Sequence, residues 1–197
     1  MTLPDGIHDV PAGKIAAVVT SLEMLARVPA RPEPASPLLQ LRRVATVDHA
    51  WYRRLYSAVG ADWLWYSRLR MSDTELAAIV SDPDVEIFAL EQAGRETGLL
   101  ELDFRRAGQC ELGFLGLAPP AIGTGAGRWL MNRAVARAWS RPIARFWVHT
   151  CTLDHPDALD FYCRSGFRPV RRQIEIADDP RLTGVLPRNA ALQVPIL

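Results

Sequence analysis

Apolar and polar positions alternate along several stretches of the chain with the period of two that is typical of half-buried β-strands. Strands are predicted over residues 38–44, 85–90, 97–104, 110–117, 144–152 and 167–176. Short turns at Gly94 and at Ala107-Gly108 join the second, third and fourth of these strands. Such short connections predict an antiparallel meander in the middle of the chain.

Helical spacing of apolar residues occupies the segments between these strands. Helices are predicted over residues 46–60, 72–80, 128–140 and 156–166. Thr46 is the expected N-cap of the first helix, and Ser72 with Glu75 forms a capping box at the start of the second. Pro156 is expected at the start of the fourth helix and Gly166 at its end.

The resulting order is β-α-α-β-β-β-α-β-α-β, which predicts a mixed α/β (α+β) fold with a mostly antiparallel central sheet flanked by helices. The strand at 144–152 follows a helix, so it is expected to run parallel to the strand that ends at Leu117.

Three regions are expected. Residues 1–37 form a proline-rich N-terminal extension, in which 15–19 is either an extra short strand or the start of a helix continuing to Leu25. Residues 38–177 form the main domain, and residues 178–197 form a C-terminal tail packed on it. The extension ends in a linker whose prolines exclude a helix: Pro29, Pro32, Pro34 and Pro37.

Composition excludes several classes of protein. The 197-residue chain has a net charge of +1, which gives no reason to expect nucleic acid or an anionic membrane as a partner. Cys110, Cys151 and Cys163 are widely spaced and form no CxxC pair, so neither a disulfide framework nor a metal site is expected. No signal peptide or transmembrane segment is visible, and a cytoplasmic location is expected.

A glycine-rich loop stands between the strand ending at Leu117 and the next helix. Gly123, Gly125 and Gly127 carry no side chains to block a ligand, and the unpaired N–H groups at the helix start suit a phosphate or pyrophosphate. A dinucleotide-binding fingerprint would need glycine in place of Arg128, and a P-loop needs a lysine in the loop, whereas Lys14 is the only lysine.

Two motifs resemble those of the Gcn5-related N-acetyltransferase (GNAT) superfamily, which binds acetyl-CoA. The loop Ile122-Gly123-Thr124-Gly125-Ala126-Gly127, preceded by Leu115-Gly116-Leu117-Ala118-Pro119, is similar to the family's pyrophosphate loop and its lead-in strand. The segment 158–167, ALDFYCRSGF, is similar to the family's Ala-x-x-Phe-Tyr-x-x-x-Gly-Phe. The resemblance extends from about Leu38 to Gln173 and implies the GNAT fold.

The resemblance also implies a set of residues that bind acetyl-CoA as co-substrate: Leu115, Leu117, Ile122, Gly123, Thr124, Gly125, Ala126, Gly127, Arg128, His155 and Tyr162. Two of them depart from the family's pattern. Ile122 replaces the usual Gln or Arg, so the grip there is expected from backbone amides, and His155 stands where the family often has Asn.

Catalytic roles follow from the same resemblance. Tyr162 matches the tyrosine that protonates the CoA sulfur; the alternative is an aromatic packed against the sheet beside Phe161. Glu111 is the candidate general base, with a strand carboxylate beside Arg105 or Arg106 as the alternative. Strict strand alternation would place Glu111 on the same face as Leu115 and Leu117.

His149 and Cys151 share a strand face but are about 6.5–7 Å apart along it, too far for a hydrogen-bonded nucleophile–base pair. Both are therefore expected in the core, with His149 a secondary candidate base. Asp154 and His155 are expected to cap the helix that starts near Pro156.

The resemblance implies that the segment between the first two helices and the last strands form the acceptor wall. Trp63, Trp65 and Tyr66 lie in that segment and indicate an apolar or planar acceptor. Arg68 and Arg70 would suit an acceptor carboxylate. Alternatively, the tryptophans fill the core below the sheet.

The resemblance implies an N-acetyltransferase (EC 2.3.1 type) that transfers acetyl directly to an amine of a small molecule or of an N-terminus. The alternative from a different class is a non-catalytic acyl-CoA-binding or regulatory domain. A homodimer is compatible with the extension packing across a partner.

Overall fold

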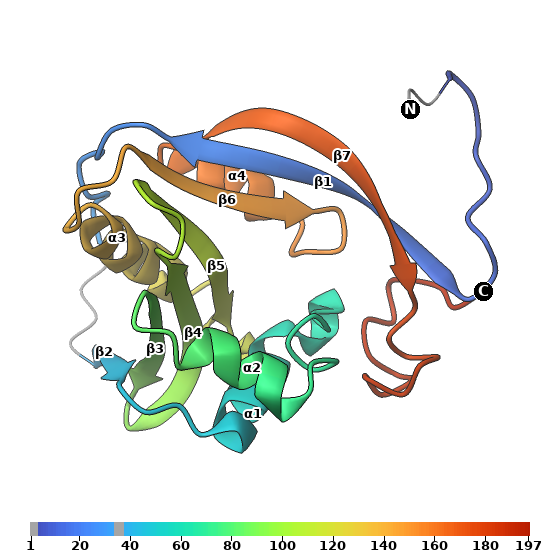
Figure 1. Cartoon of the computed structure of the whole chain (residues 1–197), viewed down its shortest axis with the longest axis horizontal. Helices are drawn as coiled ribbons and strands as arrows, with labels where there is room; N and C mark the ends of the chain where they lie inside the picture. The colour runs from blue at the N-terminus through green and yellow to red at the C-terminus, as the bar shows by residue number, and fades with distance from the viewer. Residues whose placement is uncertain (1–3, 34–37) are drawn as a thin grey trace.

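The computed structural model describes residues 4–33 and 38–197 and shows a seven-stranded sheet with helices on both faces (Figure 1). Its spatial strand order is β2-β3-β4-β5-β6-β1-β7. The strands are β1 (Lys14–Met24), β2 (Leu39–Val44), β3 (Val85–Gln92), β4 (Arg95–Asp103), β5 (Gln109–Leu117), β6 (Arg145–Cys151) and β7 (Arg168–Asp178). The α-helices are α1 (His49–Gly60), α2 (Asp73–Val80), α3 (Ala126–Ala138) and α4 (Ala158–Arg164). Of the linker prolines, Pro34 and Pro37 lie outside the described residues.

The expected mixed sheet and its central meander are confirmed. β3, β4 and β5 pair antiparallel in sequence order. β6, which follows α3, runs parallel to β5 as expected, but it pairs with β5 only from Gln109 to Glu111. The two strands then diverge.

The N-terminal segment forms a full eleven-residue strand, so the expectation of a strand holds and the helical alternative is wrong. β1 lies between β6 and β7 and is antiparallel to both. A strand that begins at Lys14 therefore connects the C-terminal β7 to the rest of the sheet. Without β1, β6 and β7 would have no common neighbour in the sheet.

The capping box of α2 is confirmed, because the Ser72 side chain accepts from the Glu75 amide while the Glu75 carboxylate accepts from the Ser72 amide. The other helix starts differ from those predicted. Asp48 rather than Thr46 caps α1, since its carboxylate accepts from the Trp51 amide at 2.7 Å. α3 begins two residues earlier than predicted, at Ala126, and α4 two residues later, at Ala158.

The helices divide the core between the two sheet faces. α1 and α2 pack on one face around Tyr52, Tyr56 and Leu76, which are fully buried. α3 and α4 pack on the opposite face, where Leu130 and Phe146 are fully buried. Burial of large apolar side chains on both faces holds the divergent strands β5 and β6 in place between two rigid layers.

The C-terminal segment, residues 179–197, forms a third small core with the start of β1. Arg181 organises this segment: it is buried, pairs with Asp179 at 2.7 Å, and donates to the carbonyls of Ala190, Ala191 and Val194. The segment packs against Leu64 in the connection between α1 and α2. It therefore forms an outer wall beside that connection.

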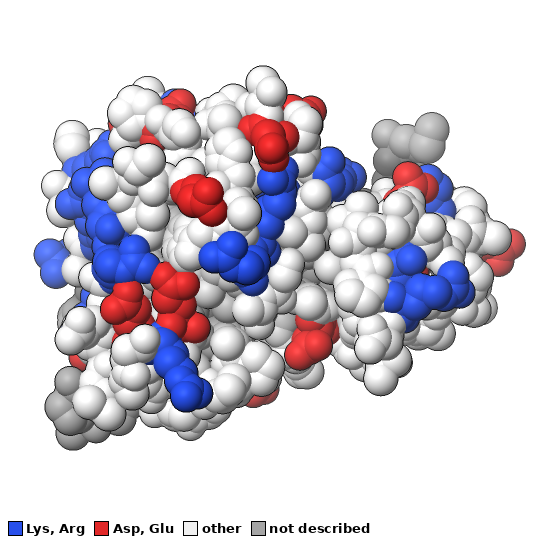
Figure 2. Space-filling model, turned by 90° about the horizontal axis from the view of Figure 1, so that it is seen from below, with Lys and Arg blue, Asp and Glu red and all other residues white. Residues whose placement is uncertain are grey.

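Arginine is the dominant cation, and many arginines are paired with carboxylates. The buried Glu86, for example, accepts from Arg137 and Arg141 on the α3 side of the sheet. Figure 2 shows acidic groups interspersed among the basic ones on one face of the molecule.

Candidate active site

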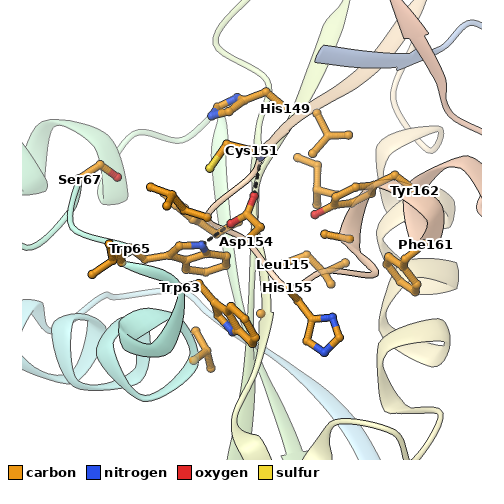
Figure 3. A pocket seen from close by; sticks show the side chains of 18 of the residues that line it. Trp63, Trp65, Ser67, Leu115, His149, Cys151, Asp154, His155, Phe161 and Tyr162 are labelled. Carbon is orange, nitrogen blue, oxygen red and sulfur yellow. Dashed lines mark hydrogen bonds between the residues drawn. The ribbon is translucent and has the colours of Figure 1, made fainter. Parts of the chain in front are cut away.

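The divergence of β5 and β6 opens a cavity of about 410 Å³ in the middle of the sheet (Figure 3). Past the Glu111–Trp147 pair, no described strand accepts hydrogen bonds on the β6 side of β5, so backbone amides there face the cavity. α4 closes one side of the cavity, and the connection between α1 and α2 closes the other. The cavity thus has two halves, which we name the groove (toward α3 and α4) and the acceptor half (toward α1 and β7).

A bulge in β5 changes which side chains face which helices. Leu112 pairs with Leu102 and Phe114 with Glu101, so Gly113 is the extra residue. Strict alternation therefore fails, and the expectation that Glu111 shares a face with Leu115 and Leu117 is wrong. Those leucines belong to the α3 face, whereas Glu111 lies on the α1 face with Phe114.

The glycine loop has the backbone geometry expected of an anion cradle. Gly123 and Gly125 have φ values of +78° and +89°, which side-chain-bearing residues rarely adopt. Gly125 is the N-cap of α3 and supplies no capping side chain, and the Thr124 hydroxyl donates to the Ala121 carbonyl at 2.8 Å. The Ala126 amide donates to the Thr124 hydroxyl at 3.4 Å, which leaves the amides of Gly127 and Arg128 available to a phosphate oxygen.

Six of the predicted cofactor residues line the cavity: Leu115, Leu117, Ile122, Gly127, His155 and Tyr162. The other five, Gly123, Thr124, Gly125, Ala126 and Arg128, form the loop and first turn beside its mouth. A Cβ at Gly127 would lie 3.5 Å from Leu117, which is an ordinary van der Waals contact, so packing alone does not require glycine there. Arg128 donates to the Pro32 carbonyl and so ties the N-terminal segment to α3.

Tyr162 projects its hydroxyl into the cavity from α4 (Figure 3). Its ring packs edge-on against Phe161 and Phe167. The same side chain therefore packs in the core through its ring and reaches the cavity with its hydroxyl. Burial raises the pKa of the phenol well above its usual value, so the hydroxyl keeps its proton near neutral pH.

Glu111 and His149 lie together where β5 and β6 begin to diverge. The distance from His149 Nδ1 to Glu111 Oε1 is 3.7 Å. His149 lines the cavity and its side chain is 51% exposed, so the expectation of a core histidine is wrong. Glu111 stands behind it and is not itself among the cavity-lining residues.

The pKa of Glu111 is raised to about 7, first by burial and then by the negative charges of Asp103 and Glu101. Register explains these neighbours, because β4 places Asp103 directly opposite Glu111. A carboxylate with a pKa near 7 is well matched to accepting a proton at neutral pH.

Cys151 also lines the cavity instead of lying in the core, and it is half-buried. Burial raises the pKa of its thiol to about 11, so the neutral thiol predominates and the thiolate nucleophile is scarce.

Asp154 does not cap α4 as expected, because its carboxylate points the other way. One oxygen accepts from Trp65 Nε1 at 2.8 Å, and the other accepts from the Thr150 hydroxyl and the Cys151 amide (Figure 3). Asp154 thus joins the end of β6 to the acceptor half. His155 does make a local contact, since its ring nitrogen accepts from the Asp157 amide at 3.1 Å.

Trp63, Trp65 and Tyr66 all line the cavity on the side of the connection between α1 and α2. The expected carboxylate-binding arginines do not fit that role. Arg68 forms a salt bridge with the buried Glu101, with 2.6 Å between Nη2 and Oε1. Arg70 lies over the Tyr66 ring and does not line the cavity.

Sequence reasoning missed five acceptor-half residues from other parts of the chain: Ile15, Ala17, Tyr56, Phe114 and Leu153. Ser67, Glu175 and Ala177 lie in regions expected in the acceptor wall, but they were not singled out. The alternation along β1 was the only signal for Ile15 and Ala17, and nothing in the sequence placed β1 beside β6.

The residues fit an acyl-CoA. A glycine loop at a free helix start suits its pyrophosphate, and a gap between two strands suits its extended pantetheine arm. No group of three or more His, Cys, Asp or Glu side chains that could hold a metal ion occurs within residues 4–33 and 38–197. Within the same ranges, no helix is long and apolar enough to cross a membrane.

The fold and the divided cavity define an acyltransferase-type architecture, and comparison with known proteins identifies the family. The model of the acetyltransferase (GNAT) family matches residues 49–167. The chain belongs to the GNAT family, whose members use acetyl-CoA to acetylate amine acceptors. No curated protein sequence matches the chain.

Three solved structures illustrate the likeness of fold. A conserved protein of unknown function from Staphylococcus epidermidis is 13% identical with a TM-score of 0.58, covering 85% of this chain and 63% of its own. A GCN5-related N-acetyltransferase from Sphaerobacter thermophilus is 13% identical with a TM-score of 0.59, over 83% and 52%. An aminoglycoside acetyltransferase from an uncultured soil sample is 16% identical with a TM-score of 0.53, over 65% and 87%. The chain therefore spans about half to two thirds of the length of the first two.

Proposed function

We propose that the chain is an acetyl-CoA-dependent N-acetyltransferase that transfers the acetyl group directly to the amine of a small molecule or of an N-terminus. The observation that carries the proposal is the placement of two proton-handling sites on one cavity. The Tyr162 hydroxyl enters the cavity from α4, and the Glu111–His149 pair lies where β5 and β6 diverge, with His149 lining the cavity.

In this proposal the loop from Ile122 to Arg128 holds the pyrophosphate with backbone N–H groups, while Leu115 and Leu117 line the groove for the pantetheine arm. Acetyl-CoA supplies an activated thioester. The free amides of β5 past Glu111 are oriented to donate hydrogen bonds to the thioester oxygen as it gains negative charge.

The acceptor amine must lose a proton before it can attack, because an ammonium has no lone pair and an alkyl amine has a pKa near ~10. His149 is the group that faces the cavity, and Glu111 lies 3.7 Å behind it. We propose that Glu111 accepts the proton, through His149 or through water. The Tyr162 phenol is protonated near neutral pH and donates its proton to the departing CoA sulfur.

The acceptor half favours an amine on an apolar, planar body. Trp63, Trp65 and Tyr66 supply flat apolar surface, and Glu175 is the carboxylate at its rim. Arg68 is paired with Glu101, and the arginine that lines the cavity, Arg164, lies on α4 on the groove side. Among the described residues the acceptor half therefore offers no arginine to an acceptor carboxylate. The closest chemical match is therefore a small aromatic or aliphatic amine without an adjacent carboxylate.

An acceptor screen monitored by CoA thiol release tests the proposal. The amines 2-phenylethylamine, phenylalanine, ethanolamine and an N-terminal peptide differ in ring and carboxylate content. Thiol release that depends on one of these amines, with loss in the Tyr162→Phe variant, supports the proposal. Acetyl-CoA binding by calorimetry without amine-dependent thiol release across a broad panel would instead support the non-catalytic acyl-CoA-binding alternative.

A further inference from the structure

β7 is the edge of the sheet, and its outer side is open. The strand order ends at β7, which pairs with β1 on one side and with no described strand on the other. Every residue from Arg168 to Ile176 is exposed, so neither face of the strand is covered along that length. A long open edge with unpaired N–H and C=O groups is a template for another strand.

Apolar side chains gather on one face of this edge. Ile174 and Ile176 are 55% and 53% exposed, and the register places Val18, which is 37% exposed, directly opposite Ile174. Ala16 lies opposite Ile176 and is also exposed. These four residues form a continuous apolar surface that reaches the open edge, and no described part of the chain covers it.

The N-terminal arm, residues 4–12, adds a second unpartnered element beside the same edge. It runs away from the body of the protein in Figure 1, and its Ile7 is fully exposed. Gly13 fixes its base next to the end of β7, because the Gly13 carbonyl accepts from the Asp179 amide at 2.9 Å. The arm therefore leaves the sheet from the β1 side of β7, so the outer side of β7 stays open.

We propose that this surface binds a second copy of the chain, with the two β7 strands paired antiparallel about a two-fold axis at Gln173. In such pairing the two sheets join into one, and each face of the sheet continues from one copy into the other. Two residues that lie directly opposite each other across the interface must therefore point to the same face. Centring the axis on Gln173 sets Arg171 opposite the partner's Glu175, and the symmetry repeats this ion pair on the other side of the axis.

Charge selects this register over its neighbours. An axis at Arg172 would place Arg172 opposite the partner's Arg172, which is repulsive. An axis at Ile174 would place Arg171 opposite the partner's Ala177 and leave Glu175 without a cation. The register shift between β7 and β1 lies near Val170, so the stretch from Arg171 to Asp178 is regular and free to pair.

This dimer also brings the partner to the rim of the cavity. Glu175 lines the acceptor half, so the partner's Arg171 would lie beside that rim. The open edge of β7 supports this dimer whether or not the chain is an acetyltransferase.

Sedimentation equilibrium of the full chain tests the pairing by charge exchange. We expect the wild-type protein at twice its 21.9 kDa mass. Arg171→Glu should raise the dimer dissociation constant at least about 10-fold, because it sets four carboxylates around the axis. The double variant Arg171→Glu with Glu175→Arg exchanges the two charges and should return the dissociation constant to near the wild-type value.

Arg54→Glu, on the exposed surface of α1, is the matched control for the change in net charge and should leave the mass unchanged. Circular dichroism of each variant verifies that the sheet is intact. A wild-type chain that sediments as a 21.9 kDa monomer at every concentration overturns the proposal. A double variant that remains as dissociated as Arg171→Glu overturns the Gln173 register.

Discussion

His149 Nδ1 lies 3.7 Å from Glu111 Oε1, across the point where β5 and β6 separate. The pair joins a half-exposed imidazole that faces the cavity to a partly buried carboxylate whose pKa is raised to about 7. A carboxyl group with a pKa near neutrality is thereby positioned beside a cavity that the glycine loop also borders.

Glu111→Gln should lower kcat/KM by about 10²- to 10⁴-fold, because the amide cannot accept a proton. In the wild-type enzyme we expect kcat/KM to rise with pH and to level off above about 7, where Glu111 is ionised. Thiol-release rates between pH 5.5 and 9 measure both effects. Glu91→Gln, which changes a surface carboxylate paired with Arg42, is the control and should keep the wild-type profile. A Glu111→Gln profile that matches the wild-type one would exclude Glu111 as the base.

Glu111 should also make folding stability depend on pH. Its pKa is higher in the folded protein than in the unfolded chain, so the folded state binds the extra proton between about 4.5 and 7. The stabilisation is complete below about pH 4.5 and is lost as the pH rises through about 7, by on the order of 2–3 kcal/mol. Urea unfolding of the wild type and of Glu111→Gln at pH 5 and pH 8 isolates this contribution as a difference. An equal difference at the two pH values would contradict the raised pKa.

Tyr162→Phe should reduce kcat by about 10- to 10³-fold while leaving the KM for acetyl-CoA within a few-fold, because only the proton donor is removed. The ring contacts with Phe161 and Phe167 are retained in this variant, so its melting temperature should stay close to that of the wild type. Steady-state kinetics with saturating acceptor provide the measurement. An unchanged kcat would assign Tyr162 to packing alone.

Gly123→Ala should weaken acetyl-CoA binding about 10-fold or more, because alanine disfavours the φ of +78° that shapes the loop. Gly94→Ala is a closely matched control: its φ is +77°, and a Cβ at either position meets no atom within 4 Å. Both variants should lose a similar 1 kcal/mol or so of stability. Calorimetry should find weaker binding in Gly123→Ala alone; equal weakening in both would point to general strain.

Trp65→Phe should raise the KM for the acceptor by several-fold without changing the KM for acetyl-CoA. The reason is that phenylalanine cannot make the hydrogen bond from the indole N–H to Asp154, which holds this part of the acceptor half in place. Trp65→Phe should also lower the free energy of unfolding by about 1–3 kcal/mol, since a partly buried carboxylate loses a donor. Trp51→Phe removes the equivalent indole bond to Glu96 at the surface and should cost less than about 1 kcal/mol. Equal losses in the two variants would mean that the Asp154 bond has no special role.

The sequence by itself was sufficient for the elements that local patterning controls. The alternation of the meander, the Ser72–Glu75 capping box and the glycine loop depend on residues only a few positions apart, so they could be predicted from spacing alone. The same local motifs carried the resemblance to the GNAT family. Tyr162 could be predicted as the proton donor to the CoA sulfur because it belongs to such a motif.

Tertiary structure decided the rest, because the deciding contacts join residues far apart in the chain. The bulge at Gly113 moved Glu111 to the opposite sheet face, and no local pattern marks where an extra residue enters a ladder. His149 reached Glu111 only because β5 and β6 pair in parallel before they diverge. The placement of β1 between β6 and β7 depends on pairings across more than a hundred residues, and it both completed the acceptor half and left β7 as the open edge.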